Sequence, residues 1–598
     1  MEFNQSSFSG GMNLLVDDTR LPVNSKYKLG DNPYDLGYSQ YREAFNIRNR
    51  YDVLTPVKSG LKDPAAPAGL KQELVTFGNY IILFVNGFAY YRYYTDTGWR
   101  QIEGFQMSST APRFWTCVVP VGTTNYARIA ATGSTTDLRA NPAGGIQTAS
   151  VIGANAGNNP GLLVQDNINQ PQFIFLNGAG NIVVRTTQTF GQWSITYTNA
   201  TNVEVAKDAS GNYLDNREYV PIGNCMAWNN GVLYLVSQDF SSIYRSVSGR
   251  PLDFMVNVTN LLATVAPYTQ YGGGDATTTS YTVGVGGISC IRPVSSGGIF
   301  VAASNANFIV TQNTSPTAPT LFGEYTFIRT FLFNATCLSD RAIMDSLGDT
   351  RFIDLTGIRS FNAIQQLQNE GRNSQFSAPI SIAFTNIVQD ASLSAAILYD
   401  NYEFYAVTST FGTSIVVYDT ILACWASFDL SQTGGKRIKA FAKIELSIQR
   451  LYAITEDNEL YTLYEVENNS TAYVRLGAVA NLPKTSQSVG NIRCVLNNVT
   501  ADCEISAIPF TDNRLSEKSV QTKQVTYVPP VYPYTGIVNM SDLNTQLTNV
   551  LFSFPNGQQG WKSFPVIQWT GTSSLVYVSM DIKEGNTMNP LMAQATVK

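Results

Sequence analysis

The chain has no histidine, and only 14% of its 598 residues are charged, against about 25% in an average soluble protein. Without histidine, Ser-His-Asp triads, Cys-His pairs and histidine-ligated zinc sites are excluded. Exposed helices, coiled coils and helical bundles are disfavoured as well, because Ser, Thr, Asn, Gln and Gly take the place of charged residues and suit strands and turns better.

Cysteine pairs and long apolar runs are also missing. The seven cysteines are scattered and include no CxxC pair, so we expect reduced, buried thiols in a protein made in a cytoplasm. The longest apolar run, residues 80–91, is interrupted by Asn86 and Gly87 and is shorter than the ~20 residues that span a bilayer. The first residues lack the basic and apolar regions of a secretory signal. We therefore expect a soluble protein without a membrane segment.

What the chain does have is aromatic residues, with 32 Tyr, 31 Phe and 7 Trp. Such a chain can bury enough apolar surface to fold, so general disorder is excluded. Its net charge is −5. This charge argues against binding of the chain as a whole to nucleic acids or anionic membranes, but it does not exclude a local basic patch.

Residues 70–465 repeat one sequence pattern. A short segment rich in aromatic or β-branched residues is followed by a Gly/Asn turn and then by a second such segment. Asn86-Gly87, Asn177-Gly178 and Asn230-Gly231 each separate two such runs, which is the turn chemistry of β-hairpins. Meanders at a spacing near ~40–45 residues are typical of propeller blades. We predict an all-β protein in which residues 70–465 form a β-propeller.

This region is long enough for roughly nine blades, more than the usual four to eight, so part of it is expected to be insertion. Two segments rich in small residues, about 108–168 and about 255–286, are the predicted insertions. Residues 334–346 and 362–371 are the predicted short helices.

The two ends of the chain differ from this repeat. Residues 1–60 are predicted to be an extended N-terminal arm and assembly segment, because small residues and breakers disrupt both the strand and the helix period in the first 35 residues. Residues 38–50 alternate like a strand or a short helix, with apolar contacts at Tyr41, Phe45 and Ile47. Residues 466–598 show longer strands and are predicted to form a C-terminal β-sandwich or platform domain.

The sequence contains no phosphate-binding loop and no dinucleotide-binding fingerprint. The acid pair Asp17-Asp18, and Asp349 with Asp354, could bind a divalent cation, but such pairs are common on surfaces and in turns. We therefore expect no catalytic residues, no metal and no cofactor, and a protein that is not an enzyme.

A competing hypothesis is a carbohydrate-binding or glycan-hydrolysing propeller. Trp99, Trp193 and Trp228 would then be exposed sugar platforms, whereas tryptophans in the cores of blades explain the same residues more simply. The N-terminal arm favours a ring subunit, since a self-contained lectin has no use for such an arm.

The opening segment, FSGGMNLLVDDTRLPVNSKYKLGDNPYDLGYSQYREAFNIRNRYDVLTPVKSG, is similar to the start of the tail tubular protein B (nozzle) and packaged-DNA stabilisation proteins of short-tailed bacteriophages. The positions that match are Phe8, Gly10, Gly11, Asn13, Asp17, Asp18, Leu21, Pro22 and Asn46. Phrases at 244–254, 354–361 and 418–429 resemble blade segments of the same proteins, and 560–585 resembles their closing sandwich.

The resemblance implies a structural virion protein, made in the host cytoplasm and located in the phage tail. It implies a homo-hexameric ring around the DNA exit channel that retains packaged DNA and conducts it during ejection. The implied partners are the tail adaptor or tube protein, the tail fibres, and double-stranded DNA that passes without sequence-specific binding. The nine matching residues are then the predicted assembly interface.

Overall fold

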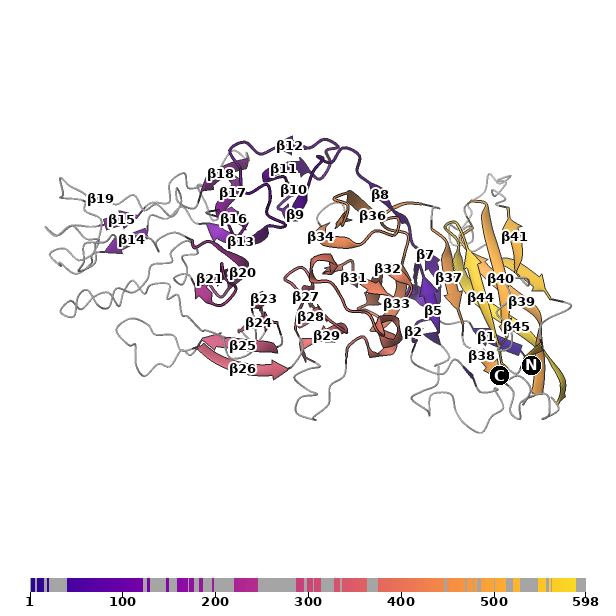
Figure 1. Ribbon diagram of the computed structural model, residues 1–598. Coiled ribbons are helices and arrows are strands. Elements are labelled where there is room, and N and C mark those ends of the chain that lie inside the picture. The colour runs from indigo at the N-terminus through magenta and orange to yellow at the C-terminus, as the bar shows by residue number, and fades with distance from the viewer. Residues whose placement is uncertain are drawn as a thin grey trace, which may run out of the picture.

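The computed structural model is built almost wholly of β-strands (Figure 1). The structure describes residues 2–5, 8–14, 19–20, 40–121, 126–129, 147–149, 159–169, 171–176, 182–186, 196–197, 220–245, 287–294, 298–304, 306–312, 327–333, 336–362, 375–445, 449–467, 470–476, 478–480, 485–499, 501–511, 520–526, 547–554, 559–560 and 562–587. The predicted fold class is confirmed: the protein is all-β, with a β-propeller, a C-terminal β-sandwich and an N-terminal arm.

Seven antiparallel sheets follow one another along the chain and around a ring in Figure 1. Within each sheet, neighbouring strands pair in chain order, which is the up-and-down order of a propeller blade. Sheet by sheet, the strands are β9 (Lys71–Phe77), β10 (Tyr80–Val85), β11 (Phe88–Tyr93) and β12 (Arg100–Gln101); β13 (Trp115–Val121), β16 (Asn159–Gln165), β17 (Gln172–Leu176) and β18 (Ile182–Thr186); β20 (Gly223–Asn229), β21 (Val232–Ser237) and β22 (Ile243–Arg245); β23 (Ile288–Pro293), β24 (Ile299–Ala303), β25 (Ala306–Gln312) and β26 (Phe327–Phe333); β27 (Ile343–Ser346), β28 (Asp349–Asp354) and β29 (Gly357–Ser360); β30 (Ala395–Tyr399), β31 (Tyr402–Ser409), β32 (Gly412–Asp419) and β33 (Cys424–Asp429); and β34 (Ile438–Ile444), β35 (Arg450–Thr455) and β36 (Leu460–Val466).

Turn chemistry fixes the hairpins where the sequence predicted them. Asn86 and Gly87 join β10 to β11 with φ of 51° and 83°, and Asn230 and Gly231 join β20 to β21 with φ of 48° and 82°. Two successive positive φ values match the right-handed twist of the flanking strands, and Asn-Gly adopts them at low cost. The third predicted turn, Asn177-Gly178, lies outside the described residues.

The ring is closed by a strand from the N-terminal segment. β8 (Ser59–Lys62) pairs antiparallel with β36 and so completes the last sheet, while the first strand of that sheet, β34, packs against β9 of the first sheet. Residues 59–62 therefore belong to the propeller, although the sequence placed residues 59 and 60 in the arm. At the other end, β36 stops at Val466, the residue at which the sequence pattern changes.

Two sheets form the C-terminal sandwich. One holds β1 (Glu2–Gln5), β45 (Ser574–Thr587), β39 (Thr485–Asn497), β42 (Thr548–Ser553) and β43 (Gln559–Gly560); the other holds β3 (Thr19–Arg20), β38 (Ala478–Ala480), β44 (Lys562–Trp569), β37 (Ala472–Arg475), β40 (Cys503–Thr511) and β41 (Gln521–Val525). Cys494 on β39 and Cys503 on β40 therefore belong to different sheets and not to one hairpin, and both thiols are free.

The second sandwich sheet continues into the propeller through β5 (Glu43–Phe45). This short strand pairs antiparallel with β37 of the sandwich and parallel with β33 of the sixth blade, so that one sheet of eleven strands runs through both parts. The sandwich consequently lies beside the outer edge of the sixth blade, at the right of Figure 1. A segment from the beginning of the chain thus joins two parts that follow it in sequence.

The predicted insertion at 108–168 is too wide. β13 and β16 are neighbouring strands of the second blade, and Val119 and Leu162 on them are fully buried. Between and beyond them, β14 (Tyr126–Ile129), β15 (Gln147–Ala149) and β19 (Thr196–Tyr197) form a separate sheet at the left of Figure 1. The other predicted insertion, 255–286, lies outside the described residues.

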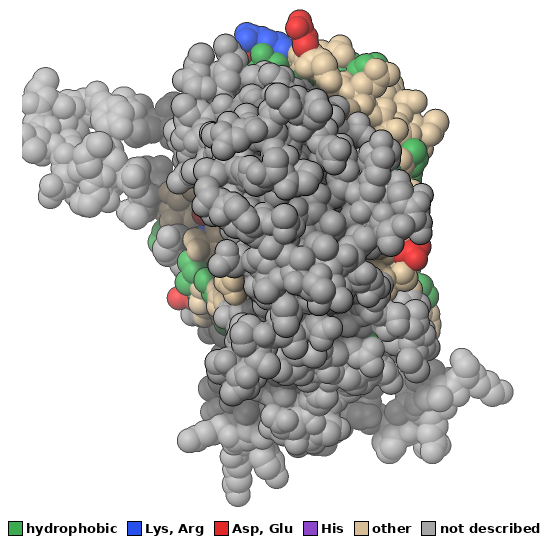
Figure 2. All heavy atoms as spheres, turned by 90° about the vertical axis from the view of Figure 1, so that its left-hand side faces the viewer, with side chains coloured by type: hydrophobic (Ala, Val, Ile, Leu, Met, Phe, Trp, Pro, Cys, Tyr) green, Lys and Arg blue, Asp and Glu red, His purple; other side chains and the backbone are tan. Residues whose placement is uncertain are grey.

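Figure 2 looks at the molecule from this left-hand end. Apolar, acidic and uncharged described side chains are spread around the rim of the view, and basic ones gather at its upper edge. The described surface on this side thus carries no extended area of one charge.

The helix predicted at 334–346 is wrong. Residues 336–342 run as a turn, and β27 follows as the first strand of the fifth blade. Pairing with β28 outweighs the local helix propensity. The helix predicted at 362–371 lies almost wholly outside the described residues. Short 3-10 turns do occur, as η1 (Arg50–Asp52), η4 (Ala378–Phe384) and η5 (Ala391–Leu393), and among the described residues no helix is long and apolar enough to cross a membrane.

Candidate functional site

The predicted assembly residues fall into two groups. Phe8, Gly10, Gly11, Asn13 and Asn46 are described and lie where the propeller meets the sandwich, whereas Asp17, Asp18, Leu21 and Pro22 lie outside the described residues. The four arm residues of the first group, Phe8, Gly10, Gly11 and Asn13, lie on a surface that we call the arm seat, made by β4 (Gln40–Tyr41), Asn49, Pro379, Cys424 and Trp425.

Apolar side chains hold the arm in the seat. Phe8, Met12 and Leu14 are 0%, 2% and 4% exposed, and they share one core with Tyr41 and Trp425. Full burial of side chains of this size stabilises by about 1.5–3 kcal/mol each. The described part of the arm is therefore an integral part of the fold.

Hydrogen bonds fix the position of the arm along the seat. The Asn13 amide donates to the Tyr41 carbonyl at 3.1 Å, and the Leu14 amide donates to the Pro379 carbonyl at 2.8 Å. The Asn49 side-chain amide donates to the Phe8 carbonyl at 3.3 Å. β2 (Gly11–Met12) also runs parallel to β4, with Gly11 beside Gln40. Bonds from several elements select one register for the arm.

Glycine is required at position 11 for two reasons. Its φ is +69°, and a Cβ there would lie 2.6 Å from the Trp425 carbonyl oxygen and 2.7 Å from the Cys424 Sγ. A side chain would meet both a strained backbone and fixed atoms. A backbone requirement for glycine therefore applies to Gly11, while Gly10 occupies the preceding turn, closed by the Gly11 amide and the Phe8 carbonyl at 3.3 Å.

The described residues of the arm lie on their own chain. Their role as an assembly interface stays a prediction. Phe8 is fully enclosed and Gly11 is buried, so neither presents surface to another subunit in this conformation. Asn13 and Gly10 are half-buried.

Asn46 ties the propeller to the sandwich through its side chain. Its Oδ1 accepts hydrogen bonds from the Leu430 amide at 2.8 Å and the Ser431 amide at 3.2 Å, while its Nδ2 donates to the Thr471 carbonyl at 3.0 Å. Its φ of 55° is one that Asn adopts more easily than most residues. The residue acts as a junction, next to the β5 strand that joins the same two parts.

Two arginines beside this junction were not singled out from the sequence. Arg48 forms a bidentate pair with the buried Asp429, at 2.7 and 3.1 Å, and its guanidinium lies 5.0 Å from the centre of the Tyr464 ring. Arg50 pairs with Asp419 at 3.0 Å. One feature of the sequence could have identified these two arginines, namely their spacing. Residues two apart in an extended segment share a face.

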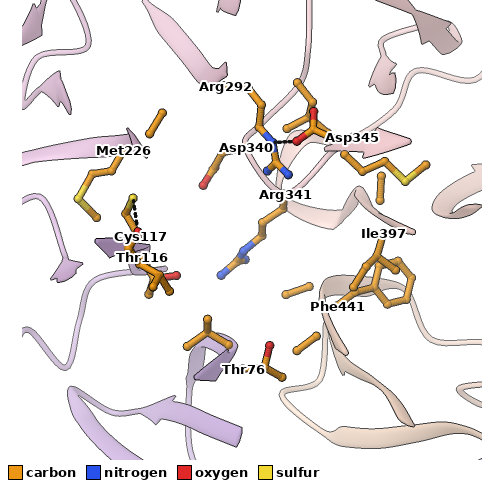
Figure 3. A pocket seen from close by; sticks show the side chains of 18 of the residues that line it. Thr76, Thr116, Cys117, Met226, Arg292, Asp340, Arg341, Asp345, Ile397 and Phe441 are labelled. Atoms are coloured by element: carbon orange, nitrogen blue, oxygen red, sulfur yellow. Dashed lines mark hydrogen bonds and ion pairs between the residues drawn. The ribbon is translucent and has the colours of Figure 1, made fainter. Parts of the chain in front are cut away.

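The second region is the propeller channel, a cavity of about 620 Å³ lined by the first strands of all seven blades (Figure 3). Its wall mixes polar and charged groups with apolar side chains, among them Val118, Met226, Trp228, Ile397 and Phe441. A cavity of this size and character lies in the range that small ligands occupy in proteins.

Two ion pairs lie at this channel. Arg341, from the turn before β27, extends into the middle of the ring in Figure 3 and contacts Glu73 on β9 at 2.8 Å. Arg113 pairs with Asp340 at 2.7 Å beside it. Burial lowers the pKa of Arg341 although Glu73 opposes this. The pairs connect the fifth blade with the first and with the loop that leads into the second.

The charged groups at the channel wall are paired. Asp345 lies 3.2 Å from Arg292, and Lys443 lies 2.8 Å from Glu445. Burial raises the pKa of the Cys117 thiol to about 12, so only about one thiol in 10⁵ is a thiolate at pH 7. At neutral pH the channel wall thus offers a mixed polar and apolar surface with compensated charges.

The remaining candidates have ordinary structural partners. Trp99 donates its Nε1 hydrogen to Asp63 at 3.3 Å and has Arg92 over its ring at 4.6 Å, so one ring face is occupied. Trp228 is half-buried at the channel, and Trp193 lies outside the described residues.

The two acids weighed as metal ligands are engaged separately. Asp349 accepts from Ser360 at 2.6 Å and Asp354 pairs with Arg359 at 2.6 Å. These carboxylates stand at opposite ends of β28 and stabilise local structure.

The searches for related proteins found similar solved structures and no related family or curated protein. No family model and no curated protein matches the chain. Similar solved structures include a streptogramin B lyase, with 9% identity over 68% of this chain and 96% of the other and a TM-score of 0.32. Virginiamycin B lyase from Staphylococcus aureus matches with 9% identity, 68% and 99% coverage and a TM-score of 0.32. The Cps50 (Swd1) β-propeller domain of Myceliophteria thermophila matches with 8% identity, 68% and 100% coverage and a TM-score of 0.26.

These neighbours correct the prediction that the chain is not an enzyme. Two of the matched structures are of lyases, so the absence of histidine and of recognised motifs was not a sufficient reason to exclude enzymes. The correction goes no further, because TM-scores of 0.32 and identities of 9% carry no argument for a lyase reaction in this chain. Its propeller is established by its own strand order and ring closure.

Proposed function

We propose that the chain is a subunit of the tail nozzle of a short-tailed bacteriophage, forming a ring around the DNA exit channel that retains packaged DNA and conducts it during ejection. The observation that carries the proposal is the opening phrase, in which Phe8, Gly10, Gly11, Asn13 and Asn46 match the nozzle proteins. The described matching residues also lie together, at one junction between propeller and sandwich.

The junction supports this role mechanically. β5 and Asn46 join the propeller to the sandwich at neighbouring points, and the Arg48–Asp429 pair fixes the same segment to the sixth blade. A wall that holds packaged DNA under load needs domains that do not hinge, and a shared sheet provides this. In the proposed virion, the tail adaptor or tube protein and the tail fibres contact the outside of such a body.

In the proposed ring, DNA passes between subunits in the lumen, because the Arg341 side chain extends into the inside of each propeller, where it pairs with Glu73. The net charge of −5 per chain gives an assembled ring an average repulsion for phosphate, which favours sliding over sequence-specific binding.

The experiment that tests this function is a mass measurement of purified protein by multi-angle light scattering. A closed oligomer, six-fold in the expected case, or assembly induced by isolated tails, supports the nozzle. A monomer that neither self-assembles nor joins tails contradicts it.

A second candidate, a carbohydrate-binding propeller, has one observation in its favour. Trp228 lines the channel near the Arg292–Asp345 pair, and an aromatic ring beside polar groups is a common sugar platform. Quenching of tryptophan fluorescence by added oligosaccharides, lost in Trp228→Ala, would support this candidate over the nozzle.

A further inference from the structure

The charges that line the propeller channel are balanced, but its charged hydrogen-bonding groups are not. In the part of the lining that the structure describes, the carboxylates belong to Glu73, Asp340 and Asp345, and each pairs with an arginine. An arginine carries five N–H donors, whereas an ionised carboxylate only accepts. One-to-one pairing therefore leaves arginine donors without a carboxylate acceptor.

Arg341 carries free donors at the centre of the channel. Its Nε donates to the Glu73 carboxylate at 3.1 Å, and its Nη2 donates to the same carboxylate at 2.8 Å and to the Gln72 carbonyl. Its Nη1 donates to none of the described residues. The side chain is 12% exposed and extends into the middle of the ring in Figure 3. An acceptor inside the channel would complete its hydrogen bonding.

The pair with Glu73 does not fully offset the burial of Arg341. Burial lowers the pKa of the guanidinium more than the Glu73 carboxylate raises it, and the Arg113 cation lowers this pKa as well. The charged form is therefore less well stabilised here than in water. A second negative group beside Nη1 would stabilise it, because an opposite charge within about 4–6 Å favours the charged form.

The rest of the wall suits a ligand that is partly apolar. Val118 is 44% exposed although it lies on a blade strand, and Phe441 lines the same cavity of about 620 Å³. Arg292 and Lys443 also line it, and each has N–H donors left after pairing with one carboxylate. The excess of cationic donors favours an anionic ligand, and the apolar side chains favour one with an organic body.

We propose that the propeller channel binds a small organic anion, a carboxylate on an aromatic body, whose carboxylate accepts hydrogen bonds from Nη1 of Arg341. The body packs against Val118 and Phe441. Charge-assisted hydrogen bonds are about twice as strong as neutral ones, so the site selects a carboxylate over an alcohol of the same shape. This inference goes beyond the nozzle function and does not need an assembled ring.

The test is isothermal titration calorimetry of the full chain with three titrants. They are 2-naphthoate, which is an aromatic carboxylate, 2-naphthylmethanol, which is its neutral counterpart, and inorganic phosphate, which is an anion without an organic body. 2-Naphthoate should bind once per chain. The alcohol should bind about 10-fold more weakly or less, because it lacks the charge-assisted hydrogen bond, and phosphate should also bind more weakly.

A pair of variants locates the site. R341M/E73Q removes the proposed anchor and keeps the charge balance of the channel, and it should weaken 2-naphthoate binding by about 10- to 100-fold. The matched control is Arg450→Met, because Arg450 pairs with Glu465 at 3.5 Å outside the channel lining. This control should leave the affinity unchanged. Scanning calorimetry of both variants checks that they are folded.

The inference is overturned if 2-naphthoate gives no saturable heat at millimolar concentration, or if the alcohol or phosphate binds as tightly. It is also overturned if folded R341M/E73Q binds 2-naphthoate as the wild type does. Should this variant melt below the temperature of the titration, the comparison of 2-naphthoate with the alcohol in the wild-type protein decides.

Discussion

Replacement of Gly11 by valine should release the arm and activate the thiol beneath it. The new Cβ would lie 2.6 Å from the Trp425 carbonyl oxygen at a φ of +69°. The left-handed backbone alone costs about 1–2 kcal/mol, and the clash involves backbone that has little freedom to move. Release of the arm from its seat removes both the backbone strain and the clash, but it loses the stabilisation from the buried apolar side chains of the arm.

The thiol of Cys424 reports this release directly. Its Sγ lies 3.5 Å from the Ser9 carbonyl oxygen, and burial raises its pKa from the ordinary 9.0 to about 11. At pH 8 the thiolate fraction is then about 10⁻³, and it rises to about 10⁻¹ when the pKa returns to its ordinary range. Alkylation of Cys424, followed by peptide mass spectrometry, should be about 100-fold faster in Gly11→Val, since the thiolate is the reactive form.

A matched control separates the clash from the backbone cost. Gly78 also has a positive φ, +58°, but nothing lies within 4 Å of a Cβ built there. Gly78→Val should therefore leave the alkylation of Cys424 unchanged. Equal rates in wild type and Gly11→Val would refute the arm seat as described.

Three further outcomes are expected. Deletion of residues 2–14 should lower the thermal midpoint and cause aggregation, because it opens a core; a truncated protein with unchanged melting in calorimetry would contradict this. Arg48→Met should destabilise by about 3–5 kcal/mol in urea unfolding, because Asp429 is left buried without its partner, and an effect below about 1 kcal/mol would mean that the pair behaves as a surface pair. Arg341→Met should destabilise through the unpaired Glu73, and the double variant with Glu73→Gln should recover most of the loss; no recovery would show that the two residues are not coupled.

The sequence predicted the parts of the fold that depend on local chemistry. Asn86-Gly87 and Asn230-Gly231 predicted hairpins because positive φ is an intrinsic preference of these residues. Gly11 was identified through the resemblance of the opening segment. The segment 115–121 was missed as a strand, because a stretch rich in Gly, Ala, Asn and Thr follows it and concealed the blade boundary.

The parts that depend on distant partners were not predictable in this way. Arg48 meets Asp429, and Phe45 on β5 joins strands β33 and β37, across several hundred residues of chain. Nothing in the local sequence of 334–346 shows that pairing with β28 makes its second half a strand. The burial of Phe8, Met12 and Leu14 in the main core likewise depends on residues far along the chain, such as Trp425.

The central claim, a nozzle ring around DNA, is tested most directly by electron microscopy of the purified protein, alone and after addition to phage tails that lack it. The account predicts closed rings with a central lumen formed between subunits, and restored density at the tip of the tail. Isolated single propellers that leave the tails unchanged would contradict it.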